Sequence, residues 1–132
     1  MPMTMKKRNE TMLLNIEFED ALRDIKKTVE DIRMLAIVTE TRSEVVFYGK
    51  KDGIIKQSNN MAEEGILDPY KLDLFYREIA EHIRNSQQFK KDCLNIVKYD
   101  TNEGIRFEYA KSTESSVTIR KNWKKQIGIN KA

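Results

Sequence analysis

The stretch that begins at Asp68 carries a stripe of apolar residues at helical spacing. Its members stand at positions i, i+3, i+4, i+7 and i+11 and are Leu72, Phe75, Tyr76, Ile79 and Ile83. This period places them on one face of a helix that has a polar opposite face. Asp68 can cap the first free amides, and Pro69 suits the first helical position because proline lacks an N–H that would have no partner there. We therefore expect a helix that packs on a core and divides two strand-rich halves.

A second helix is predicted over residues 10–33. Its apolar residues recur at spacings of three and four and are Leu14, Phe18, Ala21, Leu22, Ile25, Val29 and Ile32. Acidic residues are frequent in its first half and basic residues in its second, which suits the helix dipole. Residues 1–9 are basic and show no periodicity, so we expect them to form a disordered leader.

Five segments are rich in β-branched and aliphatic residues and predict strands. They are residues 34–40, 44–48, 54–57, 94–99 and 105–109. The dipeptide Asp52-Gly53 is typical of a tight turn, because glycine accepts a positive φ at no steric cost. In the last segment apolar and charged residues alternate, which indicates a strand with one buried face. The first three segments predict an antiparallel meander, and the last two predict a hairpin.

The C-terminal segment, residues 115–129, predicts a short final helix. Ser115 or Ser116 would cap it, Ile119 and Trp123 lie one helical turn apart, and Gly128 would end it. The order of elements is then α-β-β-β-α-β-β-α. It predicts the α+β class: one domain over residues 10–132, with an antiparallel sheet of about five strands and helices mainly on one face.

The length of 132 residues suits one hydrophobic core. No apolar run approaches the roughly 20 residues of a membrane span, so we expect no membrane contact. The one cysteine, Cys93, excludes an internal disulfide and fits a reducing compartment. We therefore expect a cytoplasmic protein.

No pattern in the sequence predicts catalysis. His82 and Cys93 have no orienting partner at a diagnostic spacing, so we interpret the histidine as a surface or structural residue and the cysteine as a small hydrophobe. The five glycines stand singly, and no ligand spacing suggests a metal ion. We expect no enzyme activity, no catalytic residue, no metal and no cofactor.

Two surfaces could bind a partner. The first is acid-rich and would contact another protein through Glu63, Glu64, Asp68 and Glu81, with Arg77 as an anchor. The second is the basic C-terminal segment, which would hold nucleic acid through phosphate contacts and base stacking. Its candidate residues are Arg120, Lys121, Trp123, Lys124 and Lys125. Trp123 keeps helical spacing with Ile119 and Ile127, and a tryptophan at such spacing is more often a core anchor than a base-stacking residue.

The hairpin Gly104-Ile105-Arg106-Phe107-Glu108-Tyr109 and the closing Trp123-Lys124-Lys125-Gln126-Ile127-Gly128-Ile129, together with the order of elements, resemble the YezG-like antitoxins. Those proteins are cytoplasmic immunity proteins that neutralise nuclease toxins in bacteria. The resemblance implies a small inhibitor that binds a protein toxin of the nuclease type. The alternatives are a nucleic-acid-binding module that uses the basic segment and a small secretion or assembly chaperone.

Overall fold

Helix α3 (Pro69–Arg84) is the helix that the apolar stripe predicts. In the computed structural model, which describes the backbone of residues 2–129 and the side chains of residues 12–129, Asp68 caps this helix. Its Oδ1 accepts hydrogen bonds from the N–H groups of Tyr70 at 2.9 Å and Lys71 at 3.3 Å. The inward face buries Leu72, Phe75, Ile79, Ala80 and Ile83. The predicted cap and the predicted core face are both confirmed.

Five antiparallel strands form one open sheet in the order β3-β2-β1-β4-β5. The strands are β1 (Glu30–Val38), β2 (Ser43–Lys51), β3 (Ile54–Gln57), β4 (Cys93–Asp100) and β5 (Gly104–Lys111). The central strand β1 pairs with β2 on one side and with β4 on the other. The predicted α+β class, the meander and the hairpin are confirmed.

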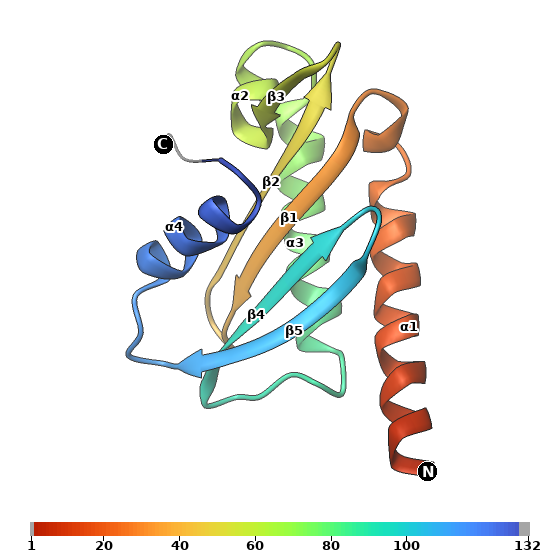
Figure 1. Cartoon of the computed structure of the whole chain (residues 1–132), viewed down its shortest axis with the longest axis vertical. Helices are drawn as coiled ribbons and strands as arrows, with labels where there is room; N and C mark the ends of the chain where they lie inside the picture. The colour runs from red at the N-terminus through yellow and green to blue at the C-terminus, as the bar shows by residue number, and fades with distance from the viewer. Residues whose placement is uncertain (1, 130–132) are drawn as a thin grey trace.

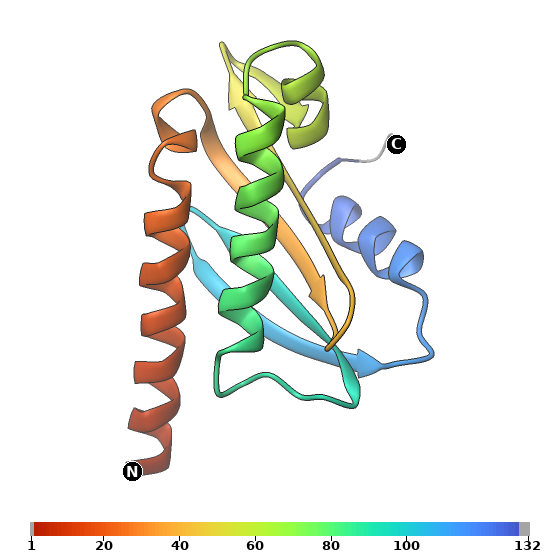
Figure 2. The same ribbon diagram turned by 180° about the vertical axis from the view of Figure 1, so that it is seen from behind.

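Helices cover both faces of this sheet. Helix α1 (Pro2–Leu22) and α3 lie side by side on one face, and α4 (Ser116–Gln126) crosses the other, as Figures 1 and 2 show from opposite sides. The larger core lies under α1 and α3, and a smaller one lies under α4. Because β1 runs between the two cores, all its residues from Met34 to Val38 are buried. Most helical cover is on one face, as expected.

The helix predicted over residues 10–33 is wrong at its C-terminal end. Helix α1 ends at Leu22, a short 3-10 turn follows at Ile25–Lys27, and β1 already begins at Glu30. The helical spacing of Val29 and Ile32 extended the predicted helix too far, because both residues are buried in the region of the sheet and not on a helix. β-Branched side chains pack well in that setting. Helix α1 also begins earlier than expected, at Pro2, so its backbone includes most of the residues 1–9 that we expected to form a disordered leader. The side chains of residues 1–11 lie outside the described part, and the disorder of this leader stays a prediction.

A short helix that the sequence did not predict, α2 (Ser58–Glu63), follows β3 directly. Ser58 and Met61 are fully buried, because Met61 reaches the larger core and the Ser58 hydroxyl accepts a hydrogen bond from the N–H of Phe47. Composition hides such a helix, since most of its residues are polar.

The final helix, α4 (Ser116–Gln126), lies within the predicted segment 115–129, between the predicted cap and the predicted stop. The Ser115 hydroxyl accepts a hydrogen bond from the N–H of Thr118 at 3.3 Å, which makes Ser115 the N-cap. Gly128 adopts a φ of 84° just past the end, a conformation that glycine accepts without strain. None of the helices in the described chain is long and apolar enough to cross a membrane.

Candidate functional site

Strand β2 pairs with β1 from Ser43 to Lys50 but with β3 only over residues 48–51. Strand β3 ends at Gln57, and the chain turns at once into α2. The N–H of Phe47 then donates its hydrogen bond to the hydroxyl of Ser58, the first residue of α2, instead of to a neighbouring strand. Within the described chain no strand pairs with the outer edge of β2 over residues 43–47.

The alternation of the ladder decides which backbone groups face this open edge. Opposed residues in an antiparallel pair alternate between exchanging two hydrogen bonds and turning their N–H and C=O groups away. At the turn, the N–H of Thr39 donates to the carbonyl of Arg42 at 2.9 Å, which sets the phase of the β1–β2 ladder. At the other end the N–H of Phe47 points away from β1, in the same phase. From both observations it follows that the N–H and C=O groups of Ser43 and Val45 point away from β1, toward the open edge of β2.

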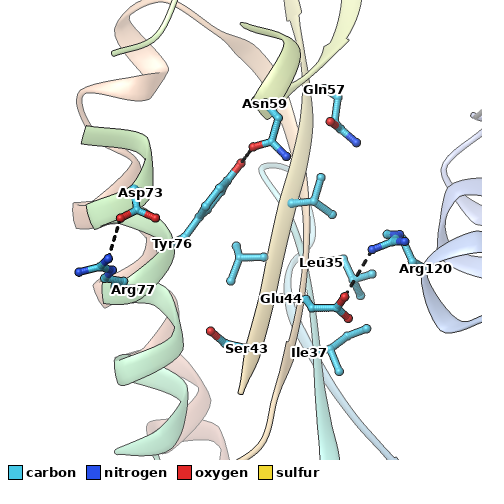
Figure 3. A pocket seen from close by; sticks show the side chains of 12 residues that line it. Leu35, Ile37, Ser43, Glu44, Gln57, Asn59, Asp73, Tyr76, Arg77 and Arg120 are labelled. Carbon is cyan, nitrogen blue, oxygen red and sulfur yellow. Dashed lines mark hydrogen bonds and ion pairs between the residues drawn. The ribbon is translucent and has the colours of Figure 1, made fainter. Parts of the chain in front are cut away.

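These groups border a pocket of about 460 Å³. Figure 3 looks along it, with α3 on one side of the sheet edge and α4 on the other. Its apolar wall is formed by residues of β1 and β2, and its polar wall by residues of β2, β3 and the three helices α2, α3 and α4. The lining residues are Leu35, Ile37, Ser43, Glu44, Val45, Val46, Gln57, Asn59, Asp73, Tyr76, Arg77 and Arg120. We call this pocket the edge groove.

Two ion pairs stand at the sides of the edge groove. On α3, a guanidinium nitrogen of Arg77 lies 3.0 Å from Asp73 Oδ2, and across the sheet one of Arg120 lies 3.5 Å from Glu44 Oε1. Their formal charges cancel. A guanidinium carries five N–H donors, so each arginine can contact a further acceptor while it keeps its carboxylate partner. Because these pairs are solvent-exposed, they contribute little to the stability of the fold and remain free to reorganise.

Tyr76 forms a fixed part of the wall. Its hydroxyl donates to Asn59 Oδ1 at 2.8 Å and shares a hydrogen bond with the Ser58 hydroxyl. Burial raises the pKa of Tyr76 above its usual value, although the hydrogen bond with Ser58 acts in the opposite direction. The phenol therefore stays protonated at neutral pH, and its hydrogen bonds hold the ring in place.

The five residues predicted to bind a protein partner do not gather in one place. Only Arg77 lines the edge groove. Asp68 caps α3, Glu64 pairs with a lysine of β3, and Glu81 lies 2.8 Å from Arg84. Glu63 is exposed at the end of α2. Four of the five therefore have contacts within the chain, since Arg77 also pairs with Asp73, and the role of all five in partner binding stays a prediction.

The residues of the basic C-terminal segment that were predicted to bind nucleic acid also lie in different surroundings. Trp123 is only 2% exposed and packs its ring 5.8 Å from that of Tyr48, so its interpretation as a core anchor is confirmed. A base cannot stack on a ring that is buried in this way. Arg120 lines the edge groove, whereas Lys121 and Lys125 are exposed on α4 and Lys124 is half-buried.

His82 and Cys93 have ordinary structural surroundings. His82 Nδ1 lies 2.7 Å from Glu17 Oε2 and joins α3 to α1, which confirms the interpretation of a structural histidine. Cys93 is half-buried at the first position of β4. Over the described side chains, no three His, Cys, Asp or Glu residues gather in a way that could hold a metal ion.

Sequence reasoning missed most of the edge groove, including Glu44, Val45, Asp73 and Tyr76. The one signal that could have indicated it is the polar run that starts at Gln57, since this run ends β3 after four residues and leaves β2 uncovered. In comparisons with known proteins, no family model matches the chain, and no curated protein or solved structure is significantly similar to it.

Proposed function

We propose that this chain is a cytoplasmic protein-binding inhibitor, an immunity protein that neutralises a bacterial toxin of the nuclease type by direct contact. The observation that carries the proposal is the edge groove. It presents an unpaired strand edge, a fixed tyrosine and two arginines on one exposed surface. Tyrosine and arginine are the residues that most often anchor protein interfaces.

The chemistry of the edge groove favours a protein over a polyanion. Its outward N–H and C=O groups match those of another polypeptide backbone, which supplies both a donor and an acceptor at each residue. Its two ion pairs cancel in charge, so the groove provides no net attraction for phosphates. A stable complex buries about 800 Å² on each partner, which would extend the contact from the groove onto α3 and α4.

Inhibition of this kind needs no covalent step. The five-stranded sheet, with a core on each face, supplies a rigid frame that holds the groove in shape before the partner arrives. A preformed surface loses little conformational entropy on binding. The inhibitor would act by covering the working surface of the toxin.

The test uses the product of the reading frame next to this gene, which the proposal expects to contain a toxin-like C-terminal domain. Co-expression with the full chain should rescue growth, and the two proteins should co-purify. The double variant Arg77→Ala, Arg120→Ala should lose protection, because it removes both arginines from the edge groove. The double variant Lys26→Ala, Lys27→Ala, which removes two exposed basic side chains outside the groove lining, α3 and α4, is the matched control and should protect fully. Absence of both protection and a complex with that domain would contradict the proposal.

The nucleic-acid alternative is favoured by the exposed Lys121 and Lys125 together with the half-buried Lys124, all on α4. It predicts a shift of DNA or RNA in a gel that weakens steeply between about 50 and 200 mM salt. Replacement of the three lysines by alanine should abolish that shift. Loss of the shift without loss of toxin protection would assign the lysines to a separate activity.

The chaperone alternative is favoured by an exposed apolar stripe on α1. Met12, Leu13 and Ile16 are each more than half exposed and stand on the helix face that points away from the core. A chaperone of this kind would use such a face for dimerisation. Sedimentation at increasing concentration distinguishes the two, because a dimer that dissociates on Leu13→Glu supports the chaperone and a monomer supports the inhibitor.

A further inference from the structure

We propose that the edge groove takes up an extended, uncharged segment of the partner polypeptide as a sixth strand, paired with β2 over residues 43–46. This inference rests on the proposed function, since it assigns the way in which the inhibitor grips its partner. The groove consists of the open edge of β2 between α3 on one side and α4 on the other, and this geometry defines the occupant (Figure 3).

The backbone of β2 sets the length and pairing of the segment. Ser43 and Val45 each direct one N–H and one C=O group to the open edge, by the ladder phase established above. A strand advances roughly 3.4 Å per residue, so four residues of β2 offer a pairing edge of about 14 Å. An incoming strand can satisfy all these groups at once, whereas a side chain or a small molecule cannot reproduce their alternating order.

The side chains of the groove set the chemistry of the segment. A residue opposite Val45 would turn to the Tyr76 side of the sheet, and its neighbours in the strand would turn to the Val46 side, because side chains alternate between faces. The Val46 side is backed by the apolar Leu35 and Ile37. The ion pairs at the sides leave no net charge for a charged residue to meet. An uncharged segment with an apolar residue on the α4 side fits best.

The other edge of the sheet, β5, is less suited to this role. Its exposed side chains include Arg106, Glu108 and Lys111, and charged residues on an edge strand discourage pairing. The hydroxyl of Tyr109 also donates to the carbonyl of Gln88, which ties the segment before β4 to this edge.

A second copy of the chain is a poorer occupant than a single strand. Two-fold pairing of β2 with β2 would set each α3 beside its own copy, as symmetry requires of an isologous contact. Each α3 carries the Arg77–Asp73 pair at the groove, so the pairing would place two helix walls beside the edge that a single strand has to reach. A free segment has no such wall of its own.

The test uses the full chain and a phage-displayed library of random peptides about ten residues long, which is the usual upper length of a strand. Selected peptides should shift the amide resonance of Val45 in a ¹⁵N NMR spectrum of the wild-type chain and protect that amide from hydrogen exchange. Val45→Pro removes the outward N–H, and proline is tolerated at such edge positions, so affinity should fall roughly tenfold or more. Lys111→Pro, at an exposed position on the opposite edge strand, is the matched control and should bind as the wild type does.

Failure to select any peptide, or selected peptides that leave the Val45 amide unshifted in the wild-type chain, would overturn the inference even if Val45→Pro did not fold. If the wild-type chain has the mass of a dimer in solution and Val45→Pro has that of a monomer, the occupant of the groove is a second copy of the chain and not a segment of a partner. Failure of the proposed function is read separately, from toxin protection. Peptide binding without protection contradicts only the immunity role, and protection that survives in folded Val45→Pro contradicts only strand addition.

Discussion

The backbone N–H of Phe47 donates to the hydroxyl oxygen of Ser58 at 3.2 Å, and the strand pairing on that side of β2 ends at this bond. A side chain from α2 thus takes the place of a further residue of β3. The same hydroxyl meets that of Tyr76, so a single serine links the sheet edge, α2 and α3. The shape of the edge groove depends on this junction.

Ser58→Ala should therefore lower the free energy of unfolding by about 2 kcal/mol, because the change leaves a buried N–H without its acceptor. Ser58 is completely buried, so water cannot easily replace the hydroxyl. Urea unfolding followed by circular dichroism measures the loss. Asn60→Ala, an exposed change in the same short helix, should stay within about 0.5 kcal/mol of the wild type. Equal stability of Ser58→Ala and the wild type would contradict this account of the junction.

Trp123 holds α4 on the sheet. Its ring fills the smaller core with Tyr48 and is flanked there by the half-buried Ile119 and Ile127. Trp123→Ala should cost about 3–5 kcal/mol, because it removes the largest side chain of that core and leaves a cavity. Thermal unfolding of the variant beside Lys125→Ala, which should unfold as the wild type does, measures the difference. A variant that unfolds at the wild-type temperature would show that α4 is held by other contacts.

Local patterns in the sequence were sufficient to predict much of the fold. The apolar stripe from Leu72 to Ile83 and the Asp68 cap located α3, because helical period and capping depend on residues only a few positions apart. The end of α1 was misplaced because the spacing of Val29 and Ile32 is shared by a helix and by a turn into a strand. The pairing of β1 with β2 and β4 determines that these residues leave the helix, and such pairing involves residues far apart in the sequence.

The edge groove was largely out of reach of sequence reasoning. Tyr76 belonged to the apolar stripe by its spacing, yet its hydroxyl lies at the groove wall. Glu44 and Arg120 are far apart in the chain and meet only because α4 crosses the sheet on the side of β2. Among the partner-binding residues proposed from charge, Arg77 was the one that this arrangement placed there.

Tyr99 predicts how stability depends on pH in the alkaline range. Burial, and to a smaller extent the carboxylates of Glu19 and Asp100, raises the pKa of Tyr99 from 10.0 to about 12. The folded chain therefore holds this proton more tightly than the unfolded chain does. The stabilising effect is complete below pH 10 and is lost as pH rises through the folded pKa, so the free energy of unfolding should fall between pH 10 and about 12.

Tyr99→Phe should make this fall shallower, because phenylalanine has no proton to lose. It should not remove the fall entirely, since burial also raises the pKa of Tyr76 and Tyr109. Urea midpoints measured at several pH values between about 9 and 12 give the slope, and Tyr70→Phe, at a residue that is 73% exposed, is the control. The same slope in Tyr99→Phe and in the wild type would contradict the assignment.

The acidic residues predicted to contact the partner call for variants that separate binding from stability. Asp68→Ala should lower the free energy of unfolding by about 1 kcal/mol, because it removes the cap of α3. Asp68→Asn keeps an oxygen that can accept the same hydrogen bonds, so it removes the charge and retains the cap. Glu63→Ala changes an exposed side chain and should leave stability unaltered.

The double variant Glu63→Ala, Asp68→Asn therefore tests the predicted acidic contact without unfolding the chain. If the contact exists, the double variant should protect less well against the toxin at unchanged stability, and the loss should shrink as salt is raised, because screening weakens charge attraction. The combination Glu30→Ala, Glu103→Ala removes two exposed acids elsewhere and is the matched control for net charge. Full protection by the acidic double variant would leave the edge groove, with Arg77 in its wall, as the surface that meets the partner.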